Sequence, residues 1–270
     1  MTDARPPEPR SEPSMLERWL SGGRVAVAAL VVSVVALIVA VAPYASGGDF
    51  NARVRTYLVE HPEVLQEASD ALNARAQLQQ AALDRQKAAE ISARVAANPA
   101  LLTVDARDAA FGPTDARVTV IEFFDFRCPG CKATAPEVLR LMQAHPDVRF
   151  VFKDWPILDG PSDGLSHHAA RAAQAAHRQG QYLPVFRALM AEPALSESRI
   201  DAILTANGVA LPQAEAAMAG PEIARHLADI QTSATVLGLV GTPTFFVNGK
   251  AMDSIQPAAL DASIRKAKAG

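Results

Sequence analysis

Residues 118–136 read VTVIEFFDFRCPGCKATAP and contain Cys128 and Cys131, which are the two cysteines of the 270-residue chain. The apolar run from Val118 to Phe124 is rich in β-branched and aromatic residues, which predicts a strand, and the residues after Cys131 have a helical pattern. A Cys-x-x-Cys pair between a strand and a helix is typical of a redox dithiol. Because the chain has no third cysteine, no structural disulfide competes for these thiols.

Zinc binding is the alternative use of this spacing, because two cysteines supply half of a tetrahedral site. Such a site needs two further ligands, for which His145, His167 and His168 are the nearest candidates. His167 and His168 lie in an Ala-rich helical run, where a surface or packing role is the simpler interpretation. With no second Cys-x-x-Cys pair in the chain, we expect no metal at the dithiol.

A second motif lies far downstream, where residues 241–250 read GTPTFFVNGK. This segment resembles the cis-proline strand and hairpin of the thioredoxin superfamily. The segment from Glu122 to Pro136 resembles the active-site segment of the same superfamily, including the proline that follows the second cysteine. The two motifs also occur in the superfamily's order along the chain. The resemblance implies a thioredoxin fold with Cys128 and Cys131 as its active-site dithiol.

Other elements predicted from the residues agree with this order. The stretch from Val148 to Phe152 is a second strand candidate. Asn248-Gly249, between two apolar segments, is the signal of a hairpin with a type I′ turn. Pro257 opens a closing helix with apolar residues on one face. The predicted order is therefore strand, helix, strand, long insertion, hairpin and helix.

The long insertion, at about residues 156–238, is predicted to be helical. An Ala-rich run stops at Gly180, another segment stops at Gly208, and a further helix starts at Pro221. A helical insertion at this point resembles the DsbA-like branch of the superfamily. The predicted fold class is α/β, a thioredoxin fold with a helical insertion at residues 106–270, preceded by a transmembrane helix and a helical stalk.

The N-terminal part of the chain contains an uninterrupted apolar stretch, from Val25 to Ala42, with Ser33 as its one polar member. This length lies at the lower edge for a transmembrane helix and exceeds a usual signal-peptide core. Ala40-Val41-Ala42 has the small-residue pattern of a signal cleavage site, but Pro43 follows the cut position and opposes cleavage. We expect residues 25–42 to be an uncleaved membrane anchor, with a cleaved signal as the alternative.

Arginines define the predicted orientation of this anchor. Arg18 and Arg24 precede the apolar stretch, whereas the first charge after it is Asp49. The positive-inside rule therefore keeps residues 1–24, a Pro-rich tail predicted to be disordered, in the cytoplasm. The rest of the chain then lies in the periplasm or its equivalent, where disulfides form and persist.

Residues 43–105 are predicted to form a helical stalk between the anchor and the domain. The predicted helix carries a narrow apolar stripe, formed by Val54, Leu58, Leu65 and Leu72. Such a stripe is either the exposed face of a solvated spacer or a seam that pairs copies of the chain. Residues 55–65, RTYLVEHPEVL, are similar to the N-terminal stalk of ScsC-type proteins, in which the stalk makes oligomers. Both interpretations stay open.

Charge and composition exclude other classes of function. The formal net charge is −3 and the chain has no basic block, so we expect no nucleic acid partner. No glycine-rich phosphate loop follows a predicted strand, so a nucleotide cofactor is not expected. We expect no other cofactor.

The two cysteines have different predicted roles. Cys128 lies at the predicted N-terminus of a helix, where unpaired N–H groups and the helix dipole favour an anion. The pKa of its thiol should therefore fall below the ordinary value of about 8.5. Cys128 is the expected nucleophile that forms a mixed disulfide with a substrate, and Cys131, one turn further and less exposed, is the residue that resolves it.

Glu122 is a third candidate catalytic residue. It stands six positions before Cys128, where the DsbA-like family has an acidic residue beneath the active site. A carboxyl buried there would have a raised pKa and could exchange a proton with Cys131. Asp125 is expected to be exposed, and Lys153-Asp154 is expected to be a solvated pair or part of the active-site rim.

The candidate substrate-binding residues are Thr242, Pro243, Pro129 and Gly130. The resemblance places the bond between Thr242 and Pro243 beside Cys128, with the Thr242 backbone open for pairing with an extended substrate segment. Such pairing would tolerate many substrate sequences.

The sequence therefore predicts a membrane-anchored thiol-disulfide oxidoreductase that forms, isomerises or reduces disulfides in secreted or periplasmic proteins. Its expected partners are protein substrates with thiols or disulfides, a redox partner that resets the dithiol, the inner membrane, crossed once by residues 25–42, and further copies of the chain if the stalk pairs. The alternative is a thioredoxin-like module that holds a client or copper through the same cysteines without turnover, because soft thiolates suit Cu(I). The direction of electron flow is not defined by the sequence.

Overall fold

The computed structural model of the chain describes residues 23–45, 47–160 and 164–270. The predicted cytoplasmic tail at residues 1–24 lies, except for its last two residues, outside this description. Contacts divide the chain into two compact units, Met1–Arg75 and Ala76–Gly270.

The first unit consists of helices in its described part. Helix α2 spans Gly23–Ala45, α3 spans Gly47–Glu60, and α4 begins at Pro62 and continues to Ala97 in the second unit. Within α2, the segment Val25–Ala42 is long and apolar enough to cross a membrane, and no other described part of the chain covers it. Proline at the first position of α4 explains the break after α3, since proline has no N–H for the preceding helix.

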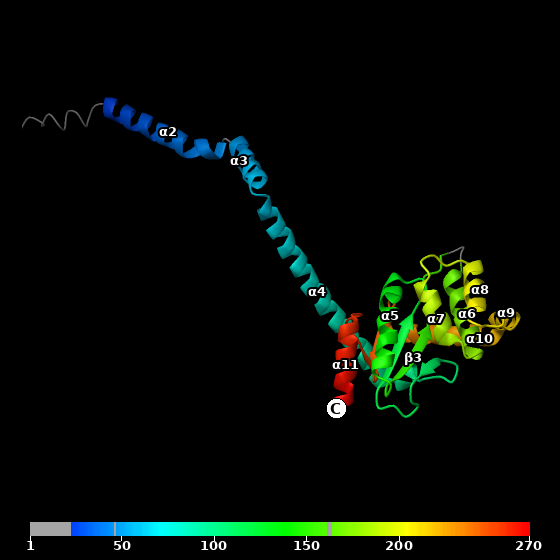
Figure 1. Ribbon diagram of the computed structural model, residues 1–270. Coiled ribbons are helices and arrows are strands. Elements are labelled where there is room, and N and C mark those ends of the chain that lie inside the picture. The colour runs from blue at the N-terminus through cyan, green and yellow to red at the C-terminus, as the bar shows by residue number, and fades with distance from the viewer. Residues whose placement is uncertain (1–22, 46, 161–163) are drawn as a thin grey trace, which may run out of the picture. The chain divides into compact units, whose positions relative to one another are not determined.

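A mixed sheet of five strands lies at the centre of the second unit in the part that is described (Figure 1). The strands are β1 (Ala109–Phe111), β2 (Thr119–Phe124), β3 (Arg149–Asp154), β4 (Thr244–Val247) and β5 (Lys250–Ala251), in the order β1-β3-β2-β4-β5. Strands β2 and β3 are parallel and the other pairs are antiparallel. The two predicted strands and the predicted hairpin are confirmed. Strand β1 was not predicted, because three residues are too short to show an alternating pattern.

Seven α-helices belong entirely to the described part of this unit: α5 (Pro129–Ala144), α6 (Leu165–Arg178), α7 (Tyr182–Ala191), α8 (Glu197–Ala206), α9 (Leu211–Ala219), α10 (Pro221–Leu237) and α11 (Pro257–Ala269). A single 3-10 turn spans Pro99–Leu102 before the sheet. Figure 1 shows the insertion helices α6 to α10 gathered on one side of the sheet and α11 on the other. The insertion is helical as predicted, but it has more helices than the three segments that the sequence distinguished, because short connections separate α7 from α8 and α8 from α9.

Two glycine positions explain local turns. Asn248 and Gly249 have φ values of 47° and 79°. Two consecutive positive φ values are what a type I′ hairpin turn requires, so the predicted turn between β4 and β5 is confirmed. Gly238 ends α10 with a φ of 71°, a conformation that glycine adopts without steric cost.

An aromatic cluster joins the insertion to the sheet. The Phe186 ring of α7 lies 5.3 Å from the ring of Phe124 in β2 and 4.9 Å from that of Phe152 in β3, measured between centroids. Tyr182 stacks on Phe186 at 6.1 Å. All four side chains are buried. Aromatic pairs of this kind stabilise a core by about 1 kcal/mol each beyond the area they bury, so the insertion is held firmly beside β2 and β3.

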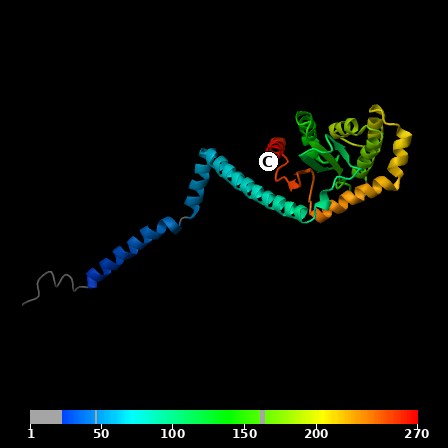
Figure 2. The ribbon, with the colours of Figure 1, turned by 90° about the horizontal axis from the view of Figure 1, so that it is seen from below.

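The second half of α4 packs against the sheet unit. Val95 is buried in the common core, the Arg94 guanidinium donates a hydrogen bond of 2.7 Å to the Leu237 carbonyl, and the Ala251 N–H donates one of 3.0 Å to the Ser92 hydroxyl. Figure 2 shows the C-terminal end of α4, in cyan, beside the end of α10, in orange. The second half of α4 therefore belongs to the second compact unit, Ala76–Gly270.

Candidate active site

The dithiol lies where β2 leads into α5. Cys128 is the N-cap residue of α5, and Pro129 occupies the first helical position. The Cys128 N–H donates a hydrogen bond of 3.0 Å to the Asp125 carbonyl, which closes the turn between strand and helix. Both cysteines are free thiols, Cys128 with 7% of its surface exposed and Cys131 with none.

The two thiols have opposite pKa shifts. The pKa of Cys128 is lowered to about 5, chiefly by a hydrogen bond from the Cys131 thiol to the thiolate, with further hydrogen bonds from Thr242 and from the backbone N–H groups of Cys131 and Gly130; partial burial opposes this. The pKa of Cys131 is raised far above its ordinary value by burial first, and then by the hydrogen bond to Cys128 and the negative charge of Glu122. At neutral pH the site therefore holds a thiolate beside a protonated thiol.

We expect the ultraviolet absorbance of the Cys128 thiolate in the reduced protein to titrate with a midpoint near pH 5. Replacing Cys131 with alanine removes the largest stabilising contact of the thiolate. A hydrogen bond to a charged group contributes about 1.5–3 kcal/mol, so the midpoint should rise by about one to two pH units. An unchanged midpoint in Cys131→Ala would leave the helix N-terminus as the cause of the low pKa.

The segment around Pro243 faces Cys128, as the motif predicted. The Thr242-Pro243 peptide bond is cis, and the Thr242 carbonyl lies 3.2 Å from Cys128 Sγ, where it accepts a hydrogen bond when the Cys128 thiol is protonated. A Cβ atom added at Gly130 would lie 3.2 Å from Pro243 Cδ and 3.7 Å from Cys128 Sγ. The fold thus brings the dithiol loop and the Thr242-Pro243 segment into contact. Neighbouring Pro129 is exposed.

Glu122 lies in the middle of β2 and is 2% exposed. It pairs in register with Phe152 of β3 and Phe245 of β4, and neither of its carboxyl oxygens has a hydrogen-bond partner. The pKa of Glu122 is raised to about 8, by burial first and then by the negative charges of Cys128 and Asp154. The side chain is therefore a protonated acid at neutral pH, in an apolar setting.

Asp154 is a second buried acid that the sequence analysis did not identify. The expectation that Lys153 and Asp154 form a solvated pair or a rim is wrong, because both side chains are buried. Asp154 accepts hydrogen bonds from Gln174 and, at 3.1 Å, from the Tyr182 hydroxyl, and burial raises its pKa to about 7. Lys153 instead donates a hydrogen bond of 2.5 Å to buried Asp108. Side chains along a strand alternate between its two faces, so Asp154 lies on the same face as Phe152, two positions earlier. An apolar residue such as Phe152 is expected to face the core, and this was the one sequence signal that could have predicted the burial of Asp154.

The expectation that Asp125 is exposed is also wrong, since only 2% of its surface is accessible. Its carboxylate accepts hydrogen bonds from the backbone N–H groups of Arg127, Ile157 and Leu158, at 2.7–3.0 Å, and from the Ser166 hydroxyl at 3.0 Å. These donors explain the burial, because a carboxylate with four partners keeps most of the hydrogen bonding it has in water. Asp125 thereby ties the dithiol turn to the start of the insertion.

Two of the three histidines considered as ligands are engaged elsewhere, and His168 has a buried Nε2 without a hydrogen-bond partner among the described residues. His145 hydrogen-bonds to Asp261 at 2.7 Å, and exposed His167 hydrogen-bonds to Asp159 at 2.6 Å. Across the described ranges, no group of three or more His, Cys, Asp or Glu side chains is arranged to hold a metal ion.

Two family models match the sequence. The model described as Thioredoxin matches residues 105–266, and the model described as Copper resistance protein ScsC N-terminal domain matches residues 49–79. The first match covers more than half of the chain and includes the dithiol, Glu122 and the Thr242-Pro243 segment.

Curated relatives share a part of their length with this chain. The Na(+)/H(+) antiporter NhaA 3 of Salinispora tropica is 32% identical over 145 residues, which are 53% of this chain and 22% of the antiporter. The Na(+)/H(+) antiporter NhaA 1 of Salinispora arenicola is 32% identical over 166 residues, which are 61% and 25% of the two chains. The chain spans no more than about a quarter of these relatives.

Solved structures share the fold. A thioredoxin-like oxidoreductase from Silicibacter pomeroyi is 34% identical and covers 62% of this chain and 95% of its own, with a TM-score of 0.57. BcfH from Salmonella enterica Typhimurium is 29% identical and covers 87% and 99%, with a TM-score of 0.54. A linker-deletion mutant of Proteus mirabilis ScsC, at 20% identity, covers 83% and 96% with a TM-score of 0.59 and is similar in fold. Together with the family match, these similarities show that the chain belongs to the thioredoxin family and has a thioredoxin-like fold, with a segment similar to the ScsC N-terminal domain at residues 49–79.

Proposed function

We propose that the protein is a membrane-anchored thiol-disulfide oxidoreductase that forms, isomerises or reduces disulfides in extracytoplasmic proteins. The observation that carries this proposal is the pairing of a Cys128 thiol of low pKa with a buried, protonated Cys131 thiol at the N-terminus of α5. A thiolate attacks disulfides at neutral pH, whereas a thiol does not. The apolar segment Val25–Ala42 supports the anchor, and the arginines before it support a periplasmic location for the dithiol.

The reductive half-reaction starts at Cys128. Its thiolate attacks one sulfur of a substrate disulfide, so that a Cys128–substrate S–S bond forms, the substrate S–S bond breaks and one substrate thiolate leaves. Cys131 then loses its proton and attacks the Cys128 sulfur, which releases the second substrate thiolate. The substrate disulfide is reduced by two electrons, and the dithiol becomes the Cys128–Cys131 disulfide. Oxidation of a substrate dithiol is the same sequence in reverse.

We propose that the thiol proton of Cys131 is transferred to the Glu122 carboxylate. The Glu122 carboxyl is buried, and its negative charge raises the pKa of Cys131, so the two groups interact electrostatically. With a pKa of about 8, Glu122 is mostly protonated at pH 7, so its ionised fraction accepts the Cys131 proton, and the protonated acid returns it in the reverse reaction. No hydrogen bond holds its oxygens elsewhere.

The substrate segment is proposed to lie along Thr242 and Pro243. The Thr242 carbonyl lies 3.2 Å from Cys128 Sγ. Because the Cys128 thiolate has no proton to donate at neutral pH, this carbonyl is free to accept an N–H of the substrate backbone. Pro129 and Gly130 complete the surface, and the absence of a side chain at Gly130 keeps the approach to Cys128 Sγ open.

The direction of the reaction is tested by reactivation of a substrate with scrambled disulfides. The test compares three proteins: fragment 46–270, the same fragment with Cys128→Ser, and fragment 76–270, which lacks the first part of the stalk. The shorter fragment starts at Ala76 because the second half of α4 packs on the domain. Reactivation that needs the stalk and Cys128 indicates an oligomeric isomerase. Failure on scrambled substrate, with rapid exchange on a simple dithiol or disulfide, indicates an oxidase or a reductase, and no exchange with either contradicts the proposal.

We further propose that the stalk pairs copies of the chain. The stripe residues Val54, Leu65 and Leu72 are 40%, 54% and 65% exposed within a single chain. The match to the ScsC N-terminal domain model at residues 49–79 supports this assignment. Burial of such residues against another copy is favourable by about 25 cal/mol per Å² of apolar area.

Placing charges in the stripe should separate the copies. We expect fragment 46–270 to be an oligomer by light scattering, and Leu65→Glu combined with Leu72→Glu to be a monomer, because buried carboxylates without partners are strongly unfavourable. Gln77→Glu, an exposed change about 140° around the same helix from Leu72, is the control and should leave the mass unchanged. A monomeric starting fragment would identify the stalk as a spacer.

A further inference from the structure

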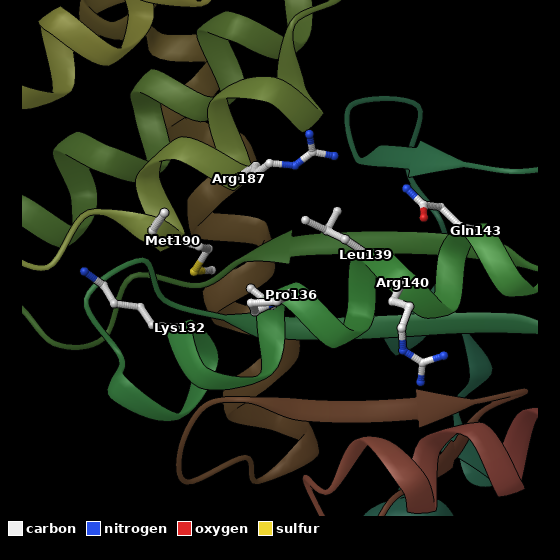
Figure 3. A pocket seen from close by; sticks show the side chains of 9 residues that line it. Lys132, Pro136, Leu139, Arg140, Gln143, Arg187 and Met190 are labelled. Atoms are coloured by element: carbon white, nitrogen blue, oxygen red, sulfur yellow. The ribbon is translucent and has the colours of Figure 1, made fainter.

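A cleft lies between α5 and α7, beginning at the residue that directly follows Cys131. It encloses about 320 Å³ and is lined by Lys132, Ala135, Pro136, Leu139, Arg140, Gln143, Arg187, Met190 and Ala191. Its middle is apolar, and Figure 3 shows Pro136, Leu139 and Met190 there. No acidic side chain lines it, although the whole chain has a net charge of −3. The cleft therefore concentrates positive charge around an apolar surface.

The two ends of the cleft carry cations without a salt bridge in the described ranges; the Glu192 carboxylate, which attracts Lys132 electrostatically, pairs with Arg199. Lys132 is half-buried and donates a hydrogen bond to the Glu192 backbone carbonyl, and burial lowers its pKa. Arg187 is exposed. Within the described ranges, neither side chain forms an ion pair. A partly desolvated ammonium group next to apolar surface gains stability from an anion bound beside it.

The spacing of these groups defines the shape of the occupant. Figure 3 shows Lys132 at one end of the cleft, and the Arg187 guanidinium and the Gln143 amide toward the other. Lys132 and Gln143 are eleven residues apart on α5, or about 16 Å along the helix. An extended peptide covers that length with about five residues. A single-headed amphiphile supplies one anionic group, whereas the cleft presents cationic or donor groups at both ends.

We propose that this cleft binds an extended segment of a partner protein in which apolar residues are flanked by acidic residues. Lys132 binds the acidic residue near the dithiol, Arg187 binds the one at the far end, and Leu139 and Met190 contact the apolar residues between them. The role of this binding, to hold a substrate or redox partner whose cysteine reacts with Cys128, rests on the proposed function. The binding itself does not need the thiols.

The test measures fluorescence anisotropy of a fluorescein-labelled, cysteine-free peptide, Glu-Leu-Val-Leu-Glu, with the full chain in neutral phosphatidylcholine nanodiscs. We expect Arg187→Glu to weaken binding about tenfold or more, because it replaces attraction by repulsion, and Lys132→Gln to weaken it several-fold. The neutral peptide Gln-Leu-Val-Leu-Gln should bind about tenfold more weakly to the unchanged protein. Arg225→Glu, the same charge change at an exposed position of α10 outside the cleft, should bind normally.

Equal binding of the acidic and neutral peptides, or equal affinities of Arg187→Glu and Arg225→Glu, would overturn the proposal. So would displacement of the peptide by myristate without any discrimination among the peptides, because the cleft would then bind an anionic amphiphile. Cys128→Ser should bind the acidic peptide as tightly as the unchanged protein. Peptide binding without thiol exchange would therefore contradict the proposed function alone, and exchange without peptide binding would contradict this inference alone.

Discussion

Cys128→Ser should lower thiol-disulfide exchange to the uncatalysed background, whereas Cys131→Ser should accumulate mixed disulfides with substrates. A serine hydroxyl does not ionise at neutral pH and forms no disulfide, so the first step is lost completely. Cys131→Ser keeps the Cys128 thiolate but removes the thiol that releases the substrate. The measurement is reduction of a model disulfide, together with intact-mass analysis of the trapped species.

The two variants also separate catalysis from passive binding. If the protein only binds a client or copper without turnover, Cys131→Ser should still bind the client and should form no covalent intermediate. Covalent capture that needs Cys128, is increased by loss of Cys131, and is reversed by a reductant supports the enzyme. Turnover in Cys131→Ser at the unchanged rate would assign resolution to a thiol other than Cys131, and the substrate is the source of such a thiol.

Local sequence was sufficient to predict the elements that build the site. The run from Val118 to Phe124 has strand-forming residues over its whole length, and Asn248-Gly249 at a turn has one dominant conformational preference. These preferences are local, so they could be read without knowing what packs nearby. The thioredoxin-like fold was predicted from the resemblance of two motifs to the thioredoxin superfamily and is shown by the family match.

Burial of charge could not be predicted in the same way. Asp125 and Asp154 look like surface residues in the sequence, because a buried carboxyl is stable only when tertiary contacts supply partners. For Asp125 those partners come from residues about 30–40 positions away, Ile157, Leu158 and Ser166. The packing of the second half of α4 was missed for a related reason, since Arg94 finds the Leu237 carbonyl 143 positions later.

Glu122→Gln should stabilise the reduced domain at neutral pH, by about 3 kcal/mol at pH 7. The pKa of Glu122 is about 8 in the folded protein and 4.5 in its ordinary state, so the folded state keeps a proton that the unfolded chain loses. Stability from this group is fully present below pH 4.5 and falls by about 1.4 kcal/mol for each pH unit as the pH rises toward 8. Glutamine does not titrate, so the difference between the proteins should vanish below pH 4.5 and grow between pH 4.5 and 8.

The measurement is urea unfolding of fragment 76–270 across that pH range, followed by the fluorescence of buried Trp155, its single tryptophan. Asp125→Asn is the matched control at another buried carboxyl. It should destabilise the domain by about 1–3 kcal/mol, because the amide turns an NH2 group toward some of the donors that the carboxylate satisfied. Opposite signs of the change in the free energy of unfolding would distinguish the two acids. Glu122 would be a buried acid that destabilises the domain and exchanges a proton, and Asp125 would be a carboxylate that stabilises the turn. A destabilised Glu122→Gln at pH 7 would mean that the carboxyl is ionised and paired in the folded protein, which would remove the raised pKa on which its proposed proton exchange with Cys131 rests.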